Sequence, residues 1–188
     1  MIRTVQLLAV LLAFCSRPAL AADDAALWTA LRAGGHVALM RHAEAPGIGD
    51  PPGFRLGDCS TQRNLSEEGR RQARMVGELF RNNGIARATL YSSQWCRCLD
   101  TAALLHLGPV TPLRALNSFF ENSGREKEQT ERIRVLIDER PAGATLLLVT
   151  HQVNITALTG VYPQSGEIVV SRPEGGKLVV LGRLRTLK

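Results

Sequence analysis

The sequence is poor in aromatic residues and has no long apolar run outside its N-terminal region. Aromatic side chains make up 5% of the 188 residues, so the core of the fold must consist mainly of Leu, Val, Ala and Ile. Neither an internal repeat nor a linker divides the chain. Because 45% of the residues are hydrophobic and 21% are charged, the composition predicts a globular protein rather than a disordered one. The length suits one domain with a core of its own.

The sequence also lacks a basic run interleaved with aromatic residues, although its formal net charge is +6 and its pI is about 9.7. A pI this high is often taken as a sign of nucleic-acid binding. Here the arginines are scattered over several segments, which argues against a nucleic-acid partner. We expect an anionic substrate or an anionic envelope surface instead.

Residues 1–21 have the layout of a secretory signal peptide. A short positive region precedes an apolar run over residues 5–14, which is too short for a stable membrane anchor. We expect cleavage near Ala21, export to the periplasm or the medium, and a mature domain over residues 22–188 that does not insert stably in a membrane. Removing the two arginines of the leader from 23 basic residues, against 17 acidic ones, leaves a mature net charge of +4.

Export permits disulfides, and three cysteines remain in the mature chain: Cys59, Cys96 and Cys98. Cys96 and Cys98 are too close in sequence to bridge each other comfortably, so we expect Cys59 to pair with one of them. A metal site at Cys96 and Cys98 is the alternative. It is disfavoured because no second His or Cys cluster lies at ligand spacing, and we expect no metal.

Apolar runs alternate with helical periodicity along the mature chain. This alternation predicts an α/β fold, a three-layer αβα sandwich with a mostly parallel central sheet and an antiparallel hairpin at one edge. The expected helices cover residues 22–34, 67–82, 94–107, 126–139 and 153–159. The expected strands cover residues 36–41, 89–91, 110–113, 145–150, 168–171 and 177–184. On the helix over 94–107, the inner face is expected to carry Leu99, Ala102, Ala103 and Leu105.

A long loop over residues 45–62 is rich in Pro and Gly, which deny both helix and strand. A loop of this length in a compact domain is usually functional. It leaves directly from His42, so we expect it to wall a site there. We expect Trp28 and Trp95 to serve in packing, and His36 to be structural.

Two strands that are far apart in sequence both end in a histidine, His42 and His151. In a parallel sheet these ends lie at the same edge, where ligands bind in open α/β folds. Arg41 precedes the first histidine, and Arg97 falls in the first turn of a helix whose N-terminus faces the same edge. Two histidines and two arginines at a helix N-terminus predict an anion pocket, with phosphate as its natural occupant.

Three motifs of this constellation resemble the histidine phosphatase superfamily, which has the phosphoglycerate-mutase-like fold. They are R-H-A at residues 41–43, S-S-x-x-x-R-x-x-x-T-A at residues 92–102 and V-T-H-Q at residues 149–152. Their order and positions match the family over essentially the whole mature chain. The sequence is therefore similar to a short, exported member of this superfamily.

The resemblance implies roles for four residues. His42 attacks phosphorus in its neutral form and becomes a phosphohistidine. Arg41 and Arg97 bind the phosphoryl oxygens, and His151 contacts the phosphoryl group as a hydrogen-bond donor. Water then hydrolyses the phosphohistidine. Neither a metal ion nor another cofactor is implied, because the arginines neutralise the phosphate.

The resemblance implies roles for two further residues. Similar short members place an arginine near the phosphate just before the first long helix, which implies Arg63; the alternative is a surface arginine at a helix start. The general acid that protonates the leaving oxygen lies beyond the third strand in many members, which implies Glu121. Glu44, two residues after His42, is the rival candidate.

We therefore expect an exported, metal-independent phosphomonoesterase that works through a phosphohistidine on His42. A mutase is disfavoured by the short chain and by the compartment, and a signalling phosphohistidine phosphatase is disfavoured by export. Some exported relatives act on envelope sugar phosphates such as lipopolysaccharide heptose phosphate, which makes such a phosphorylated glycan the candidate substrate. The alternative is a non-catalytic envelope protein that binds phosphate or a phosphosugar on the same fold. Retention of both histidines and both arginines favours the enzyme.

Overall fold

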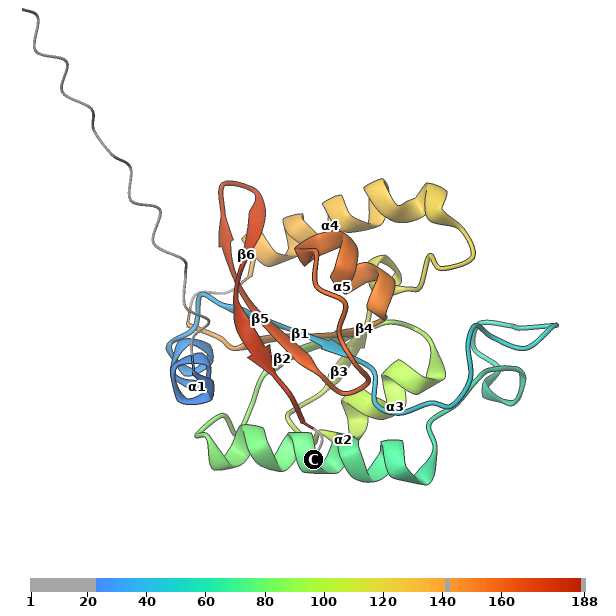
Figure 1. Cartoon of the computed structure of the whole chain (residues 1–188), viewed down its shortest axis with the longest axis horizontal. Helices are drawn as coiled ribbons and strands as arrows, with labels where there is room; N and C mark the ends of the chain where they lie inside the picture. Colours follow the sequence, from blue (N-terminus) through green and yellow to red (C-terminus); the bar gives the residue numbers. More distant parts are fainter. Residues whose placement is uncertain (1–22, 141–142, 187–188) are drawn as a thin grey trace, which may run out of the picture.

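One mixed sheet organises the computed structural model, which describes residues 23–140 and 143–186 (Figure 1). The expected signal peptide over residues 1–21 lies outside the described residues. The strands are β1 (Val37–Arg41), β2 (Thr89–Ser92), β3 (Val110–Pro112), β4 (Leu146–Thr150), β5 (Ile168–Glu174) and β6 (Lys177–Leu184). The α-helices are α1 (Asp24–Ala33), α2 (Glu67–Asn82), α3 (Cys96–Leu104), α4 (Glu126–Asp138) and α5 (Gln152–Thr159), with short 3-10 turns η1 (Cys59–Thr61), η2 (Arg114–Leu116) and η3 (Ser123–Arg125).

The strand order β3-β2-β4-β1-β5-β6 places β1 and β4 side by side in the middle of the sheet. The four strands β3, β2, β4 and β1 run parallel, whereas β5 and β6 form an antiparallel hairpin at the edge. Arg41 pairs with Thr150, so His42 and His151 leave the two central strands at the same edge. The His42 N–H donates to the Thr150 carbonyl at 3.0 Å, which extends the pairing one residue further. The predicted sheet is confirmed.

Helices cover both faces of this sheet, so the predicted three layers are confirmed as well (Figure 1). α1, α2 and α3 pack on one face, and α4 and α5 pack on the other. Successive strand residues point to opposite faces, so Ala38 and Met40 join the first core while Val37 and Leu39 join the second. None of the helices in the described ranges combines the length and the apolar character needed to span a membrane.

The start of α2 fixes the chain just beyond His42. Ser66 caps the helix by accepting a hydrogen bond from the Gly69 N–H at 3.0 Å, and Glu67 and Glu68 place acids in the first turn. A Cβ on Gly69 would collide with the carbonyl oxygen of Glu44. Only glycine lets the helix pack this closely against the backbone that follows the histidine.

α3 is shorter than the sequence predicts, because it covers Cys96–Leu104 rather than residues 94–107. The N-cap residue Trp95 has an extended backbone, and His106 has a left-handed backbone with φ of 53°, so neither residue can belong to the helix. Ala103, expected on the inner face, is exposed. Helical spacing alone did not reveal these ends.

Candidate active site

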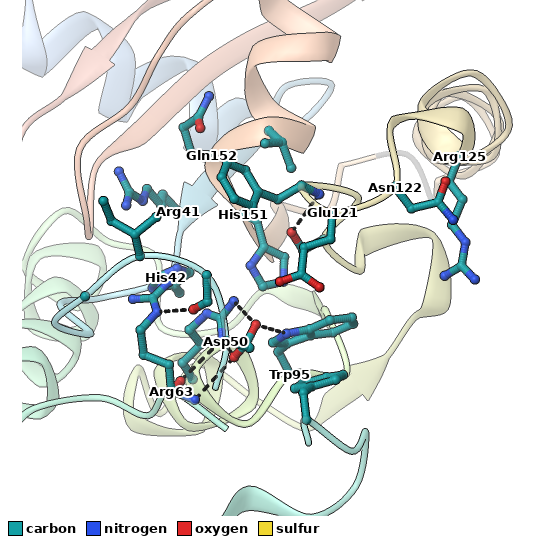
Figure 2. A pocket seen from close by; sticks show the side chains of 18 of the residues that line it. Arg41, His42, Asp50, Arg63, Trp95, Glu121, Asn122, Arg125, His151 and Gln152 are labelled. Carbon is teal, nitrogen blue, oxygen red and sulfur yellow. Dashed lines mark hydrogen bonds and ion pairs between the residues drawn. The ribbon is translucent and has the colours of Figure 1, made fainter. Parts of the chain in front are cut away.

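A cavity of about 640 Å³ opens at the carboxyl ends of the parallel strands (Figure 2). The structure brings to it all six residues that the sequence predicts for the site, namely Arg41, His42, Arg63, Arg97, Glu121 and His151. Glu44 is half-buried and is not among the residues that line the cavity. The loop over residues 45–62 walls one side, as expected, and the segment around η3 walls another.

His42 is held in one tautomer by its own backbone surroundings. Its Nδ1 lies 2.7 Å from the Ala43 carbonyl oxygen, which can only accept, so the ring hydrogen belongs on Nδ1 and Nε2 keeps its lone pair. Burial and, after it, the nearby Arg97 charge together lower the pKa of His42 to about 3. The imidazole is therefore neutral at ordinary pH, as a nucleophile must be.

His151 lies beside His42, with 5.6 Å between the ring centroids. Its Nε2 contacts the Ser93 hydroxyl at 2.8 Å and the Cys98 sulfur at 3.5 Å. The Ser93 hydroxyl donates its hydrogen to the amide oxygen of Asn117 at 3.3 Å, because that oxygen can only accept. Burial raises the pKa of the Cys98 thiol to about 12, which keeps a hydrogen on the sulfur as well. These neighbours hold the His151 ring in place beside His42.

Burial also sets the charge of His151, whose pKa is lowered well below its ordinary value by desolvation and by the Arg97 charge. Sequence reasoning missed Ser93 and Cys98 as partners of this histidine. Ser93 is one of the named residues of the motif at residues 92–102, but the motif did not indicate that it contacts His151.

Arg41 and Arg97 bring two positive charges to the same cavity. Arg41 donates from Nη1 to the Pro163 carbonyl at 3.0 Å, while its Nε has no partner among the described residues. Arg97 is 3% exposed and its Nε likewise has no partner in the described part of the chain. Both guanidinium groups therefore retain donors that an anion can satisfy.

Asp50 is the main residue of the site that sequence reasoning missed. Its carboxylate forks onto Arg97 at 2.7 and 3.2 Å and accepts the Trp95 indole N–H at 2.9 Å and the Arg63 backbone N–H at 3.2 Å (Figure 2). Burial by itself would raise the pKa of Asp50, but the hydrogen bonds from Arg97 and Trp95 outweigh it and lower that pKa. A lone Asp between Gly49 and Pro51 in an irregular loop gave no pattern that could have revealed it.

Arg63 lines the cavity but uses its guanidinium to hold the loop. Its Nε donates to the Gly49 carbonyl at 2.7 Å, and its Nη1 donates to the Ala45 carbonyl. Desolvation and the Arg97 charge lower its pKa, and Asp50 partly offsets them. Direct contact of Arg63 with phosphate stays a prediction.

An aromatic wall runs from the mouth of the cavity to the histidines. Phe54 stacks on Trp95 at 4.9 Å, and Trp95 meets His151 edge to face at 5.4 Å. The indole N–H is taken by Asp50, so Trp95 presents only apolar ring atoms to the cavity. Trp95 was expected to serve in packing; it both packs on Phe54 and lines the cavity.

Glu121 is exposed and projects into the cavity from the segment before η3 (Figure 2). A Cβ built on Gly49 would lie 3.8 Å from its Oε1, so the tip of the 45–62 loop comes close to this carboxylate. Asn122 and Arg125 lie at the edge of the same cavity. Of the two candidate acids, only Glu121 lines the cavity.

A disulfide joins Cys59 to Cys96, with 5.7 Å between their Cα atoms, and Cys98 is free and buried. The expectation that Cys59 pairs with one of the other two is confirmed, and the partner is Cys96. The Cys96 N–H also donates to the Gln62 amide oxygen at 3.0 Å. The loop is thereby fastened to the residue just before Arg97. In the described ranges no cluster of three or more His, Cys, Asp or Glu is arranged to hold a metal.

Comparison with solved structures finds the same fold in several phosphatases. The protein histidine phosphatase SixA complexed with tungstate superposes with a TM-score of 0.58 at 16% identity, over 80% of this chain and 97% of that one. A phosphoserine phosphatase mutant from Entamoeba histolytica gives 0.55 at 16% identity, covering 80% and 97%. The mycobacterial glucosyl-3-phosphoglycerate phosphatase gives 0.54 at 16%, covering 77% and 96%. At these identities the likeness concerns the fold.

No curated protein sequence matches the chain. A family model does: that of the histidine phosphatase superfamily, branch 1, matches residues 37–134. The matched range spans more than half of the chain and contains the first two of the three motifs, with His42 and Arg97. Together with the fold, the match supports phosphatase activity on a phosphorylated substrate. The chain belongs to the histidine phosphatase superfamily, branch 1.

Proposed function

We propose that the protein is an exported phosphomonoesterase that needs no metal ion and works through a phosphohistidine on His42. One observation carries the proposal: the Ala43 carbonyl holds the Nδ1 hydrogen of His42, and burial keeps the ring neutral, so the Nε2 lone pair is available beside two arginines. A buried neutral imidazole next to Arg41 and Arg97 suits attack on a phosphoryl group that those cations bind.

In the first step, His42 Nε2 forms a bond to phosphorus while the bond from phosphorus to the leaving oxygen breaks. Charge that builds on the other phosphoryl oxygens is met by Arg41 and Arg97, with His151 as a further hydrogen-bond donor. Glu121, entering as the carboxylic acid, gives its proton to the leaving oxygen. The products of this step are a free alcohol and a phosphohistidine.

In the second step, water attacks the phosphorus of the phosphohistidine and gives a proton to the Glu121 carboxylate. The bond between phosphorus and His42 Nε2 breaks, which returns the neutral imidazole and releases phosphate. Glu121 therefore ends the cycle as it began, protonated and ready for the next leaving group.

The leaving group is proposed to be an envelope sugar. The Phe54–Trp95 wall offers an apolar surface of the kind on which the C–H face of a sugar ring packs. Glu121, Asn122 and Gln152 offer polar groups elsewhere in the cavity that can pair with hydroxyls. The signal-peptide layout of residues 1–21 supports the proposed export.

The test is hydrolysis of p-nitrophenyl phosphate by the mature protein in the presence of EDTA. We expect activity that survives EDTA, an acid-labile phosphoenzyme after quenching, and loss of both in His42→Ala. The matched control is His106→Asn, because His106 is exposed, lies outside the cavity and has a left-handed backbone that asparagine tolerates. A phosphoenzyme that persists in His42→Ala would refute the assignment of the nucleophile.

Two further measurements test the finer parts of the proposal. Sugar phosphates should be hydrolysed with a higher kcat/KM than phosphoserine, and Phe54→Ala should narrow that difference. Expression of the full chain in a bacterial host should yield periplasmic protein whose N-terminus is Ala22. A wild-type protein that binds vanadate but turns over no phosphomonoester would instead indicate a phosphate-binding protein.

A further inference from the structure

The Arg97 guanidinium carries an ion pair that the reaction described above does not use. Asp50 faces it with both carboxylate oxygens, inside the cavity where the phosphoryl group is to bind. We propose that Asp50 is a positioning residue: it takes the end-on edge of Arg97 and so presents the side-on edge, Nε and Nη2, to the phosphoryl group. The inference rests on the proposed phosphatase function.

The hydrogen bonds of the Arg97 guanidinium show which of its edges is left to bind phosphate. Nη1 donates to Asp50 Oδ1 at 2.7 Å and to the Arg63 carbonyl at 3.3 Å, and Nη2 donates to Asp50 Oδ2 at 3.2 Å. Nε has no partner among the described residues although it is buried. Nη2 is the terminal nitrogen on the same side as the Nε hydrogen, so its second hydrogen and the Nε–H form one fork. Such a fork is the arrangement that binds two oxygens of a phosphate at once.

Asp50 is held in place by several bonds, so a bound phosphate would not simply displace it from Arg97. Besides Arg97, it accepts hydrogen bonds from the Trp95 indole and from the Arg63 backbone. The Cys59–Cys96 disulfide and the bond from the Cys96 N–H to Gln62 fasten its loop to the start of α3. Loop and helix start therefore form one unit in which the carboxylate and the guanidinium keep a constant relation.

Two other roles for Asp50 fit the geometry less well. A carboxylate that accepts hydrogen bonds from Arg97, Trp95 and Arg63 is stabilised as the anion, which makes it a poor proton donor to a leaving group. An inhibitory anion that phosphate must displace would have to break all of these bonds at once. It would also leave the Trp95 indole N–H without its acceptor.

The experiment compares Asp50→Asn with Asp58→Asn for binding of orthovanadate, which needs no turnover, and for kcat and KM. Asp58 lies in the same loop and pairs with the exposed Arg55, away from the cavity, so it is a matched control. We expect Asp50→Asn to weaken vanadate binding and to lower kcat/KM about 10- to 100-fold, as for other residues that orient a ligand from behind. Asp58→Asn should match the wild type in both.

A double-mutant cycle with Arg97→Lys separates positioning from a general structural effect. Lysine has no fork to orient, so Asp50→Asn should cost little further vanadate affinity in the Arg97→Lys background. Equal losses in both backgrounds would overturn the inference. So would tighter vanadate binding by Asp50→Asn, which is the expected result for a displaced inhibitory anion.

One outcome keeps this test apart from the test of the proposed function. If the wild type hydrolyses no phosphomonoester but Asp50→Asn still weakens vanadate binding, the phosphatase proposal fails and the positioning of Arg97 stands.

If Asp50→Asn does not fold, Trp95→Phe removes one hydrogen bond to Asp50 and keeps an aromatic ring. It should weaken vanadate binding about two- to fivefold, in line with the loss of a single hydrogen bond, and an unchanged affinity would count against the inference.

Discussion

The two sides of the cavity are held in place by different means. The floor, made of Arg41, His42 and His151, follows directly from two adjacent strands, and backbone pairing between β1 and β4 sets its geometry. The cover, made of the 45–62 loop, has no strand and no α-helix and is fixed by individual side-chain links. Those links are the Asp50–Arg97 ion pair, the Arg63 bonds to loop carbonyls and the Cys59–Cys96 disulfide.

This difference indicates which part of the site keeps its backbone structure after a substitution and which part depends on single side chains. Backbone pairs in the middle of a sheet are lost only when the domain unfolds, because both strands are buried on both faces. A loop held by a few side chains loses its order when one of them is changed. Substitutions in the floor should therefore affect chemistry without moving the backbone, whereas changes to the side chains that link the cover should displace the loop.

His151→Ala tests the floor and should have the largest effect. We expect kcat to fall about 100- to 1,000-fold, the usual cost of removing a donor that meets developing negative charge, with little change in KM. The measurement is steady-state kinetics with p-nitrophenyl phosphate, with His106→Asn as control. A raised KM with an unchanged kcat would mean that His151 serves only in ground-state binding.

Breaking the disulfide tests the cover. A cross-link over 37 residues is worth about 3–4 kcal/mol on the chain-entropy model, so Cys59→Ser with Cys96→Ser should lower the free energy of unfolding by about that amount. We expect kcat/KM to fall about tenfold as well, because the residue before Arg97 loses its tether; that figure corresponds to about 1.4 kcal/mol.

Urea unfolding and kinetics with and without dithiothreitol measure both disulfide effects. Dithiothreitol should lower the free energy of unfolding and the kcat/KM of the wild type, and it should leave both quantities unchanged in the double variant. Full activity of the reduced wild-type protein would show that the cover holds without its cross-link.

Acidification tests the floor again, with a smaller effect. The pKa of His42 is lowered to about 3, so between about pH 6.5 and 3 the unfolded chain binds a proton that the folded protein refuses. Stability from this group is complete above about pH 6.5 and is lost as pH falls towards 3, at up to about 1.4 kcal/mol per pH unit. His42→Gln should therefore lose less stability than the wild type between pH 7 and pH 5 in urea titrations. Equal slopes would show that His42 is protonated in the folded state.

The difference between the floor and the cover also explains which parts of the site the sequence could predict. Strand-end residues such as His42 and His151 are predictable, because a short apolar run between turn residues marks a central strand and the next polar residue falls at its end. The contacts of Asp50 are not predictable, because an irregular loop has no period from which a side-chain direction follows. The disulfide partner needed the structure too, since Cys96 and Cys98 are neighbours in sequence and only the turn of α3 separates them.

Asp50 also has a consequence for how the substrate as a whole is sensed. One carboxylate accepts hydrogen bonds from Trp95, which faces the leaving group, and from Arg97, which faces the phosphoryl group. A leaving group that packs against the indole can therefore affect Arg97 and the phosphoryl group, because the Asp50 carboxylate accepts hydrogen bonds from both Trp95 and Arg97. Binding energy from the remote part of the substrate can then act in the transition state. Good and poor substrates should differ in kcat more than in KM.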